Sequence, residues 1–482
     1  MIPAIDYIRI LPELVLAFFG CLVMVLEAFA PERGNRKLLG SLAAFGTLCA
    51  LGATLYQAQA RFAGAAFFGM VKVDQFSIFF HVVVLLISLA TILMSLEYLA
   101  VQQIRHGEYY ALILLGAVGM CLMSSANELV LIFIALEISS IASYILAGFR
   151  RRAAESAEAS LKYFLLGSFA TAFFLYGVAL IFGATGSTNI AQIAAALRAG
   201  SSPMVFLAVA LMLVGLGFKV AAAPFQIWTP DVYEGAPAPV TGFMSTGPKA
   251  AAFAVLLRVL FATNAPRDWF WLVWVAAALS MTLGNLGALV QSNVKRMLAY
   301  SSIAHAGYLL VAFVAIRQLD MGISAAMFYT ASYAAMNVGA FAVISHFARA
   351  GERYTLVEDY AGLGRRSPVL AAVFTVFLLS LIGIPITGGF FAKFYVFTAA
   401  LKSGLVWLTV LGVVNSAIGA YYYLRVIVMM YMREPREEAE IARIPLGTAC
   451  AVLICLVATI WLGVAPNGVL NYAVSSVQGL VR

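Results

Sequence analysis

Charged residues are scarce in this chain. Only 11% of its 482 residues are Asp, Glu, Lys or Arg, whereas 63% are hydrophobic, and the mean hydropathy is +0.96. A soluble globular chain carries about 25% charged residues. A chain with so little charge cannot cover itself with a water-facing surface. The composition therefore excludes a soluble protein and predicts an integral membrane protein.

Cysteine is also rare. The five cysteines stand singly in apolar runs without a CxxC pair, so the ligand spacings typical of iron–sulfur and zinc sites are missing. The chain has no glycine-rich phosphate loop, and its only basic tract is Arg150-Arg151-Arg152. We therefore expect no cofactor and no metal in this chain and no nucleic acid partner. The net charge of +8 is interpreted as a feature of membrane topology.

Long apolar runs fill the sequence. A membrane-spanning helix needs about 20 mostly apolar residues, and about fourteen runs of this kind lie between charges or Gly/Pro turns. They begin near residues 10, 38, 75, 109, 126, 160, 203, 238, 269, 297, 321, 368, 404 and 447. Unbroken runs of this length are typical of helices and not of barrel strands. We predict an all-α polytopic protein in the lipid bilayer, with no extramembrane domain.

The loops between these runs differ in basic charge. Odd-numbered loops carry sixteen lysines and arginines, whereas the even-numbered loops and the two ends carry eight. Cytoplasmic loops are enriched in Lys and Arg, so the odd-numbered loops are expected in the cytoplasm and both termini on the outer side. The eight on the outer side are Arg9, Arg61, Lys72, Arg198, Arg267, Arg317, Lys402 and Arg482.

Seven charged residues remain inside the spans or at their ends. They are Glu137, Lys162, Lys219, Lys249, Arg258, Lys393 and Arg425. A charge at the bilayer centre costs about 2.5–3.5 kcal/mol, so four lysines and a glutamate facing lipid would together cost on the order of 10 kcal/mol. They are expected to face the interior, to pair with one another or to lose their charge. The two arginines are near span ends and are expected to extend toward the interface.

A repeat organises these charges. Residues 109–268 and 269–440 each hold five spans, after three spans in 1–108 and before a last span and tail in 441–482. Units with an odd number of spans lie in opposite orientations, which is the inverted-repeat design of many transporters. The fourth span of each unit is predicted to be broken, near 215–228 by Gly215, Gly217 and Pro224, and near 383–393 beside Lys393. Interrupted spans in corresponding positions indicate a transport site.

Other polar side chains extend this set. His305 lies in AYSSIAHAGY, and an imidazole that titrates near pH 6.5 can relay protons, although a lone buried histidine is as often a packing residue. Glu137 and Lys162 fall in neighbouring spans of the first unit, so we expect them to form a pair. Asp231 and Glu234, in the loop after the first break, are candidates to collect protons at an entrance.

Around these charged and polar residues the chain resembles the antiporter-like subunits of proton-pumping NADH:quinone oxidoreductase (respiratory complex I). Its sequence motifs are typical of the subunit N branch. The resemblance covers essentially the whole chain. Its most specific segment is PFQIWTPDVYEGAPAPVTGFMSTGPKAA, and supporting segments surround Glu137, Lys162, His305 and Lys393. The family usually has histidine where this chain has Gln226, which places any proton-relay role of that position in question.

The resemblance implies a fold, a function and partners. It implies fourteen helices with a coupling pair of Glu137 and Lys162, a central axis of Lys219, Lys249 and His305, and Lys393 as the terminal lysine. The chain would be a proton-translocating subunit of a multisubunit enzyme in the bacterial inner membrane, in contact with other membrane-arm subunits, and would perform no redox chemistry itself. The alternatives are a subunit of an Mrp-type cation/proton antiporter or of a ferredoxin-driven membrane hydrogenase-type complex.

Overall fold

The computed structural model describes residues 3–31, 36–199, 203–262, 268–315, 319–348, 350–435 and 443–481. Thirteen helices within these ranges are long and apolar enough to cross a membrane. They are α2 (Leu11–Ala28), α3 (Lys37–Gln57), α4 (Gln75–Val101), α5 (Glu108–Ser125), α6 (Leu129–Ala147), α7 (Ala154–Thr185), α9 (Pro203–Val220), α11 (Ala238–Ala262), α12 (Asp268–Leu289), α13 (Val294–Val314), α14 (Leu319–Phe347), α18 (Val406–Met432) and α19 (Leu446–Val464).

The remaining predicted span is divided between two shorter helices. α16 (Pro368–Ile382) and α17 (Gly388–Lys402) follow one another across a short non-helical segment. Together they occupy the run expected to begin near residue 368, so every predicted span has a helical counterpart. The polytopic all-α class is confirmed. The inverted relation of the two units and the four-part division of the chain stay predictions.

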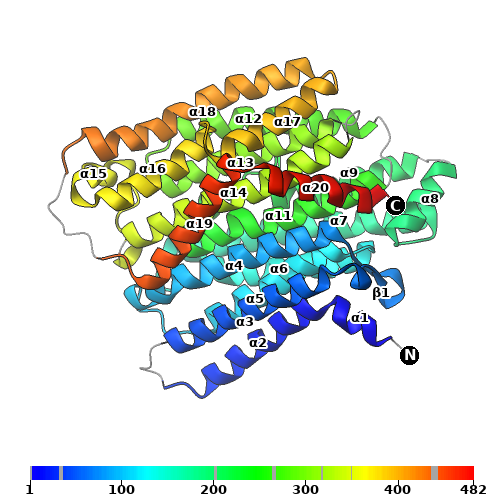
Figure 1. Ribbon diagram of the computed structural model, residues 1–482, viewed down its shortest axis with the longest axis horizontal. Helices are drawn as coiled ribbons and strands as arrows, with labels where there is room; N and C mark the ends of the chain where they lie inside the picture. The colour runs from blue at the N-terminus through cyan, green and yellow to red at the C-terminus, as the bar shows by residue number, and fades with distance from the viewer. Residues whose placement is uncertain are drawn as a thin grey trace.

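Short elements lie outside these helices. They are α1 (Ala4–Arg9), the antiparallel strands β1 (Gly64–Ala66) and β2 (Val71–Val73), α8 (Ile190–Ala199), α10 (Thr229–Gly235), α15 (Leu363–Arg366) and α20 (Asn467–Val481). The predicted C-terminal tail contains α20, which packs across α4 and α14 in front of the bundle (Figure 1). Several loop arginines used for the topology, Arg33, Arg267, Arg317, Arg349, Arg436 and Arg482, lie outside the described residues.

The bundle has an interior layer of helices. The apolar part of α11 is completely buried, and most of α4, α13 and α14 is buried too, whereas only 28% of α2 is buried. Figure 1 shows α11, α13 and α14 in the middle, with α2 and α18 at opposite edges. A helix that is apolar on all sides is stable only when it is surrounded. Side chains on α11 and α13 are therefore shielded from lipid by other helices.

The first break lies within the predicted range of 215–228, but two of the residues expected to cause it do not. α9 continues through Gly215 and Gly217 to Val220, so these glycines do not interrupt it. They permit close packing instead, because a Cβ on Gly217 would lie 2.8 Å from the Phe225 ring. The chain leaves the helix at Ala221, which has a φ of 58°, and Pro224 lies in the connection to α10. A proline here removes a donor and prevents continuation of the helix.

The second break follows the prediction closely. Gly383 ends α16 with a φ of 94°, and Pro385 and Ile386, the latter with a φ of 76°, connect it to α17. Gly389 must be a glycine because a Cβ there would lie 1.8 Å from the Ser380 carbonyl oxygen. The two half-helices are therefore held close together, which brings the second turn of α17 beside the end of α16.

Candidate functional site

Lys219 occupies the last turn of α9, directly before the first break. The side chain is buried, with 3% exposure, and its Nζ has no hydrogen-bond partner among the described residues. Nζ lies 5.2 Å from the ring centroid of Tyr144 and 5.4 Å from that of Tyr163. The faces of aromatic rings attract a cation by about 0.5–2 kcal/mol. Lys219 is thus held between two rings and not by carbonyl groups.

Glu137 is the carboxylate that acts on Lys219. It is the anionic group whose charge reaches the lysine, and its Oε1 is buried without a hydrogen-bond partner among the described residues. A buried polar group without a hydrogen bond is costly, so Glu137 and Lys219 are the candidates of the first unit for a working charge pair.

The expected pair of Glu137 and Lys162 is not formed in this structure. Lys162 Nζ lies 2.6 Å from Asp231 Oδ2 on α10 and 2.6 Å from Glu158 Oε1 one turn earlier on α7. Lys162 lies in the third turn of α7, which packs against α10, the helix that follows the break. Its side chain is 40% exposed.

A network of alternating charges forms around α10. Arg296 Nη1 lies 2.7 Å from Asp231 Oδ1 and 2.9 Å from Glu234 Oε2. Burial raises the pKa of Asp231, but Lys162 and Arg296 outweigh this effect and hold its pKa below the usual value. The acidic residues expected to collect protons are therefore paired with cations from α7 and α13.

Gln226 lies in the connection between α9 and α10. Its side-chain Oε1 is buried and lacks a hydrogen-bond partner among the described residues. An amide has no proton to exchange near neutral pH, so the position provides a polar group beside the break and not a titrating one.

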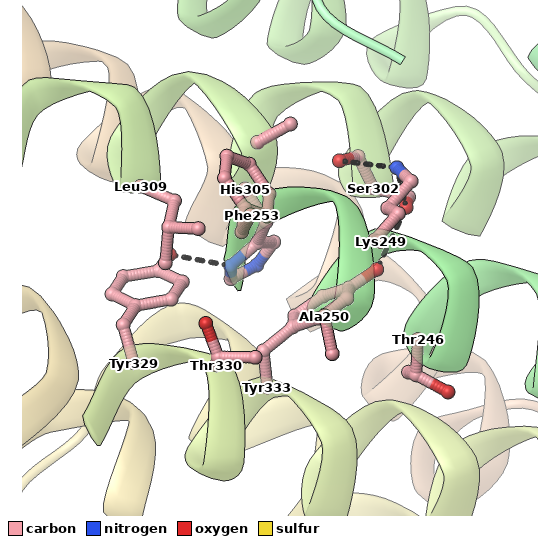
Figure 2. Close-up of a pocket in the computed structure, with 11 residues that line it drawn as sticks. Thr246, Lys249, Ala250, Phe253, Ser302, His305, Leu309, Tyr329, Thr330 and Tyr333 are labelled. Carbon is pink, nitrogen blue, oxygen red and sulfur yellow. Dashed lines mark hydrogen bonds between the residues drawn. The ribbon is translucent and has the colours of Figure 1, made fainter. Parts of the chain in front are cut away.

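Lys249 and His305 share a small cavity. Lys249 Nζ on α11 donates to Ser302 Oγ at 2.6 Å and to the Ser302 carbonyl at 3.2 Å. His305 Nδ1 lies 2.7 Å from the Tyr329 hydroxyl, as Figure 2 shows. The cavity, of about 20 Å³, is also lined by Thr330. A cavity of this size has room for about one water.

Hydroxyl groups lead from His305 toward Lys393. His305 Nε2 lies 3.4 Å from the Tyr423 hydroxyl, and the neighbouring Tyr422 hydroxyl donates to Asn285 at 3.1 Å. Asn285 Nδ2 donates to the Tyr308 hydroxyl at 3.0 Å. These polar groups, from α13, α18 and α12, lie between the central cavity and the Tyr308 ring, which Lys393 contacts.

Lys393 caps the end of a half-helix. Its Nζ donates to the carbonyl oxygens of Leu381 at 3.1 Å and Ile382 at 2.7 Å, and to Ser416 Oγ at 2.8 Å. The last carbonyls of a helix have no intrahelical partner and carry partial negative charge. The break in the span therefore creates the site that accepts the lysine. Nζ also lies 4.9 Å from the Tyr308 ring centroid.

Arg258 does not extend toward the interface as expected. It is 3% exposed, and its Nη atoms bind both oxygens of Asp74 at 3.0 and 3.1 Å. Asp74 is the N-cap of α4, so the pair fixes α11 to the start of α4. Arg425 instead donates to the backbone carbonyls of Leu289 and Gln291.

Sequence reasoning missed Glu352. It is buried and lies 2.7 Å from Lys295 Nζ and 2.8 Å from Arg150 Nη1, and it accepts hydrogen bonds from the Tyr98 hydroxyl at 2.6 Å and from Ala238 N at 2.7 Å. Lys295 also donates to the Ala236 carbonyl at 2.6 Å. From the sequence, Lys295 and Arg150 are basic loop residues. No sequence pattern indicates that both form ion pairs with the same carboxylate.

The described residues contain no group of three or more His, Cys, Asp or Glu side chains placed to hold a metal ion. All five cysteines are free thiols. The polar chemistry of the interior is therefore that of lysine, glutamate, histidine, hydroxyl and amide groups.

Buried lysines beside broken helices, in a polytopic helical bundle, define an ion-transporting class of membrane protein. The family model for the transmembrane part of NADH:quinone oxidoreductase and Mrp antiporter subunits matches residues 126–419. NADH-quinone oxidoreductase subunit N 2 of Koribacter versatilis is 69% identical over 490 residues, which cover 100% of this chain and 99% of the relative. The chain belongs to the subunit N branch of this family.

Solved structures agree with this assignment. A chain of respiratory complex I from Thermus thermophilus with bound aureothin superposes with a TM-score of 0.81 at 39% identity, covering 95% of this chain and 98% of that one. A chain of the Mrp complex from Dietzia sp. DQ12-45-1b has a TM-score of 0.84 at 22% identity, covering 99% and 97%. The second likeness concerns the fold alone.

Proposed function

We propose that this chain is a proton-translocating subunit of the membrane arm of an NADH:quinone oxidoreductase. The observation that carries the proposal is the series of buried cationic and hydroxyl groups from Lys219 through Lys249 and His305 to Lys393. Each lysine occupies a different environment: aromatic faces, a serine, and the carbonyl end of a half-helix. The family assignment supplies the enzyme to which the chain belongs.

The geometry indicates what each residue does. Glu137 sets the charge felt by Lys219, so a change in its protonation or position alters the affinity of that lysine for a proton. Lys249 and His305 exchange a proton through Ser302, the tyrosine hydroxyls and any water in their cavity. Lys393 holds the proton at the second break, where carbonyls stabilise its charged form. Redox chemistry occurs elsewhere in the complex, and this chain would bind no cofactor.

Lys162 acts in a different place from the one expected. Its contact with Asp231 joins α7 to α10, so movement of either helix changes the segment directly after Lys219. Other membrane-arm subunits, in contact with this chain in the bilayer, would transmit such movement. The basic loops support an inner-membrane orientation with both termini on the periplasmic side.

The test replaces Lys219 with Ala in the intact complex and measures NADH:quinone activity together with proton pumping in sealed vesicles. The expected result is fewer protons pumped per turnover in a fully assembled complex. Lys402→Ala is the matched control, because Lys402 is an exposed lysine at the end of α17 and its loss should leave pumping unchanged. Unchanged pumping in the assembled Lys219→Ala complex would overturn the proposal.

An Mrp-type antiporter function has weaker support. The solved Mrp chain shares the fold at 22% identity, whereas the 69% identical relative has the subunit N name over its whole length. A further discriminating measurement is pumping driven by NADH in the absence of sodium, which the antiporter alternative does not predict.

A further inference from the structure

A second buried acid lies far along the chain from the lysine series. Glu13 occupies the first turn of α2 and is 4% exposed. Neither of its carboxylate oxygens has a hydrogen-bond partner among the described residues. The other glutamate of α2, Glu27, is instead paired with Arg36 at 2.8 Å. A buried carboxylate without hydrogen bonds is costly when it is ionised, so Glu13 requires either a partner charge or a proton.

His81 is the group that faces Glu13. It is 1% exposed on α4, and its Nε2 lies 3.5 Å from Glu13 Oε1 and 3.0 Å from the carbonyl oxygen of Cys121 on α5. The carbonyl can only accept, so Nε2 carries a hydrogen. Nδ1 has no hydrogen-bond partner among the described residues.

The groups around Glu13 and His81 are mostly neutral or engaged elsewhere. The Cys121 thiol of α5 is a further titratable group beside Glu13. The Ser125 hydroxyl donates to the Cys121 carbonyl at 3.1 Å and also lies beside the Glu13 carboxyl. Asp6 and Arg9 of α1 are engaged with each other and with the β1–β2 hairpin. Within the described residues of α1, α2, α4 and α5, the ion-pair contact of Glu13 and His81 is with each other.

Two protonation states with the same number of protons are open to this pair. In the first state an imidazolium faces a carboxylate, and each charge offsets part of the burial of the other. In the second state both groups are neutral and no charge is buried, but the attraction is lost. Addition of one proton to the first state gives Glu–COOH beside the imidazolium, and removal of one gives the carboxylate beside a neutral imidazole. Every step forms or breaks one O–H or N–H bond.

We propose that Glu13 and His81 form a proton-binding site between α2, α4 and α5, separate from the lysine series. None of these three helices carries Lys219, Lys249, His305 or Lys393. The site lies at the end of α2 that is nearest the N-terminus, and its proton determines whether α2 contacts α4 through an ion pair or through neutral groups. The site does not depend on the proposed translocation function, because it needs only the geometry of these helices.

The test measures the infrared carboxylic acid C=O band of the full-length chain in lipid nanodiscs, titrated from about pH 4 to about pH 9 to cover the ordinary ranges of Glu and His. We expect the difference spectrum between the original protein and Glu13→Gln to contain a band that appears and disappears within this range, beyond the common signal of the other Asp and Glu residues. Glu27→Gln is the matched control on the same helix, and it should retain the band because Glu27 is already paired with Arg36.

His81→Gln tests whether the two residues form one site. Its loss should move the pH midpoint of the band by about one unit or more, since neighbouring charges shift proton affinities by about 1–3 units. If Glu13→Gln does not fold, His81→Gln alone decides the outcome, because it keeps the carboxylate. A Glu13→Gln spectrum identical to that of the original protein, or an unmoved midpoint in His81→Gln, would overturn the proposal.

Discussion

Lys162 Nζ lies 2.6 Å from Asp231 Oδ2, and the other oxygen of Asp231 lies 2.7 Å from Arg296 Nη1. Asp231 thus bridges a cation on α7 and a cation on α13. Because α10 directly follows the break after Lys219, this bridge fixes the segment after the first broken helix to α7 and α13. The carboxylate that holds Lys162 belongs to α10 and not to α6.

This relationship predicts which double variants interact. Lys162→Met and Asp231→Asn should lower the melting temperature of the full-length chain non-additively, because each removes the same contact. Lys162→Met combined with Glu137→Gln should be additive. Melting curves of the three single and two double variants in nanodiscs provide the measurement. The reverse pattern would restore the pair of Glu137 and Lys162 that is expected from the sequence.

The environment of Lys219 predicts that only one of two substitutions of Tyr144 reduces pumping. The Tyr144 hydroxyl is buried without a partner among the described residues, so Tyr144→Phe removes an unsatisfied group and should leave stability and pumping unchanged. Tyr144→Leu removes the aromatic face 5.2 Å from Lys219 Nζ and should reduce pumping per turnover, with a loss of about 0.5–2 kcal/mol of attraction to the charged lysine.

Both Tyr144 variants are measured in the assembled complex by pumping in sealed vesicles. Equal losses in Tyr144→Phe and Tyr144→Leu would assign the effect to the hydroxyl and contradict the role of the ring.

The sequence predicts much of this fold because span position is a local property. Long apolar runs in a bilayer must form helices, so the beginnings of α4, α11 and α16 follow from hydropathy alone. The site at Lys393 could also be predicted from the sequence, because Gly383 and Pro385 mark the break that frees the carbonyl groups. Arg258 and Asp74 are 184 residues apart, however, and no local pattern pairs them. From the sequence Glu352 is only a loop residue, because its partners Arg150 and Lys295 are also far from it along the chain.

Gly383 provides a test of the second break. Alanine there would adopt a φ of 94°, and its Cβ would lie 3.1 Å from Lys393 Cδ. Gly383→Ala should therefore destabilise the chain by about 1–3 kcal/mol from backbone strain and also reduce pumping by displacing the lysine. Gly186→Ala is the control, because Gly186 has a φ of 73° but open space around it.

The control should share the loss of stability without the loss of pumping, as measured by melting curves and by pumping in vesicles. If both variants reduced pumping equally, strain alone would explain the effect.

Glu352 predicts a pH dependence of stability. Burial raises the pKa of this carboxyl, but Lys295 and Arg150 more than offset the effect and hold it below the usual value. A carboxyl with a lowered pKa in the folded state adds stability that is fully present above its unfolded pKa, about 4.3, and is lost as the pH falls through the folded value. Breaking a buried ion pair costs about 3–5 kcal/mol, so Glu352→Gln should be destabilised by that amount at neutral pH.

The free energy of unfolding is measured in detergent micelles from about pH 7 down to about pH 3, a range that includes the unfolded value. The difference between the original chain and Glu352→Gln should shrink below about pH 4.3, because the original carboxyl then becomes protonated as well. Glu434→Gln changes an exposed carboxylate and should stay within about 0.5 kcal/mol of the original chain throughout. A Glu352→Gln difference that stayed constant with pH would show that the ion pairs with Lys295 and Arg150 do not hold this carboxyl in its charged form.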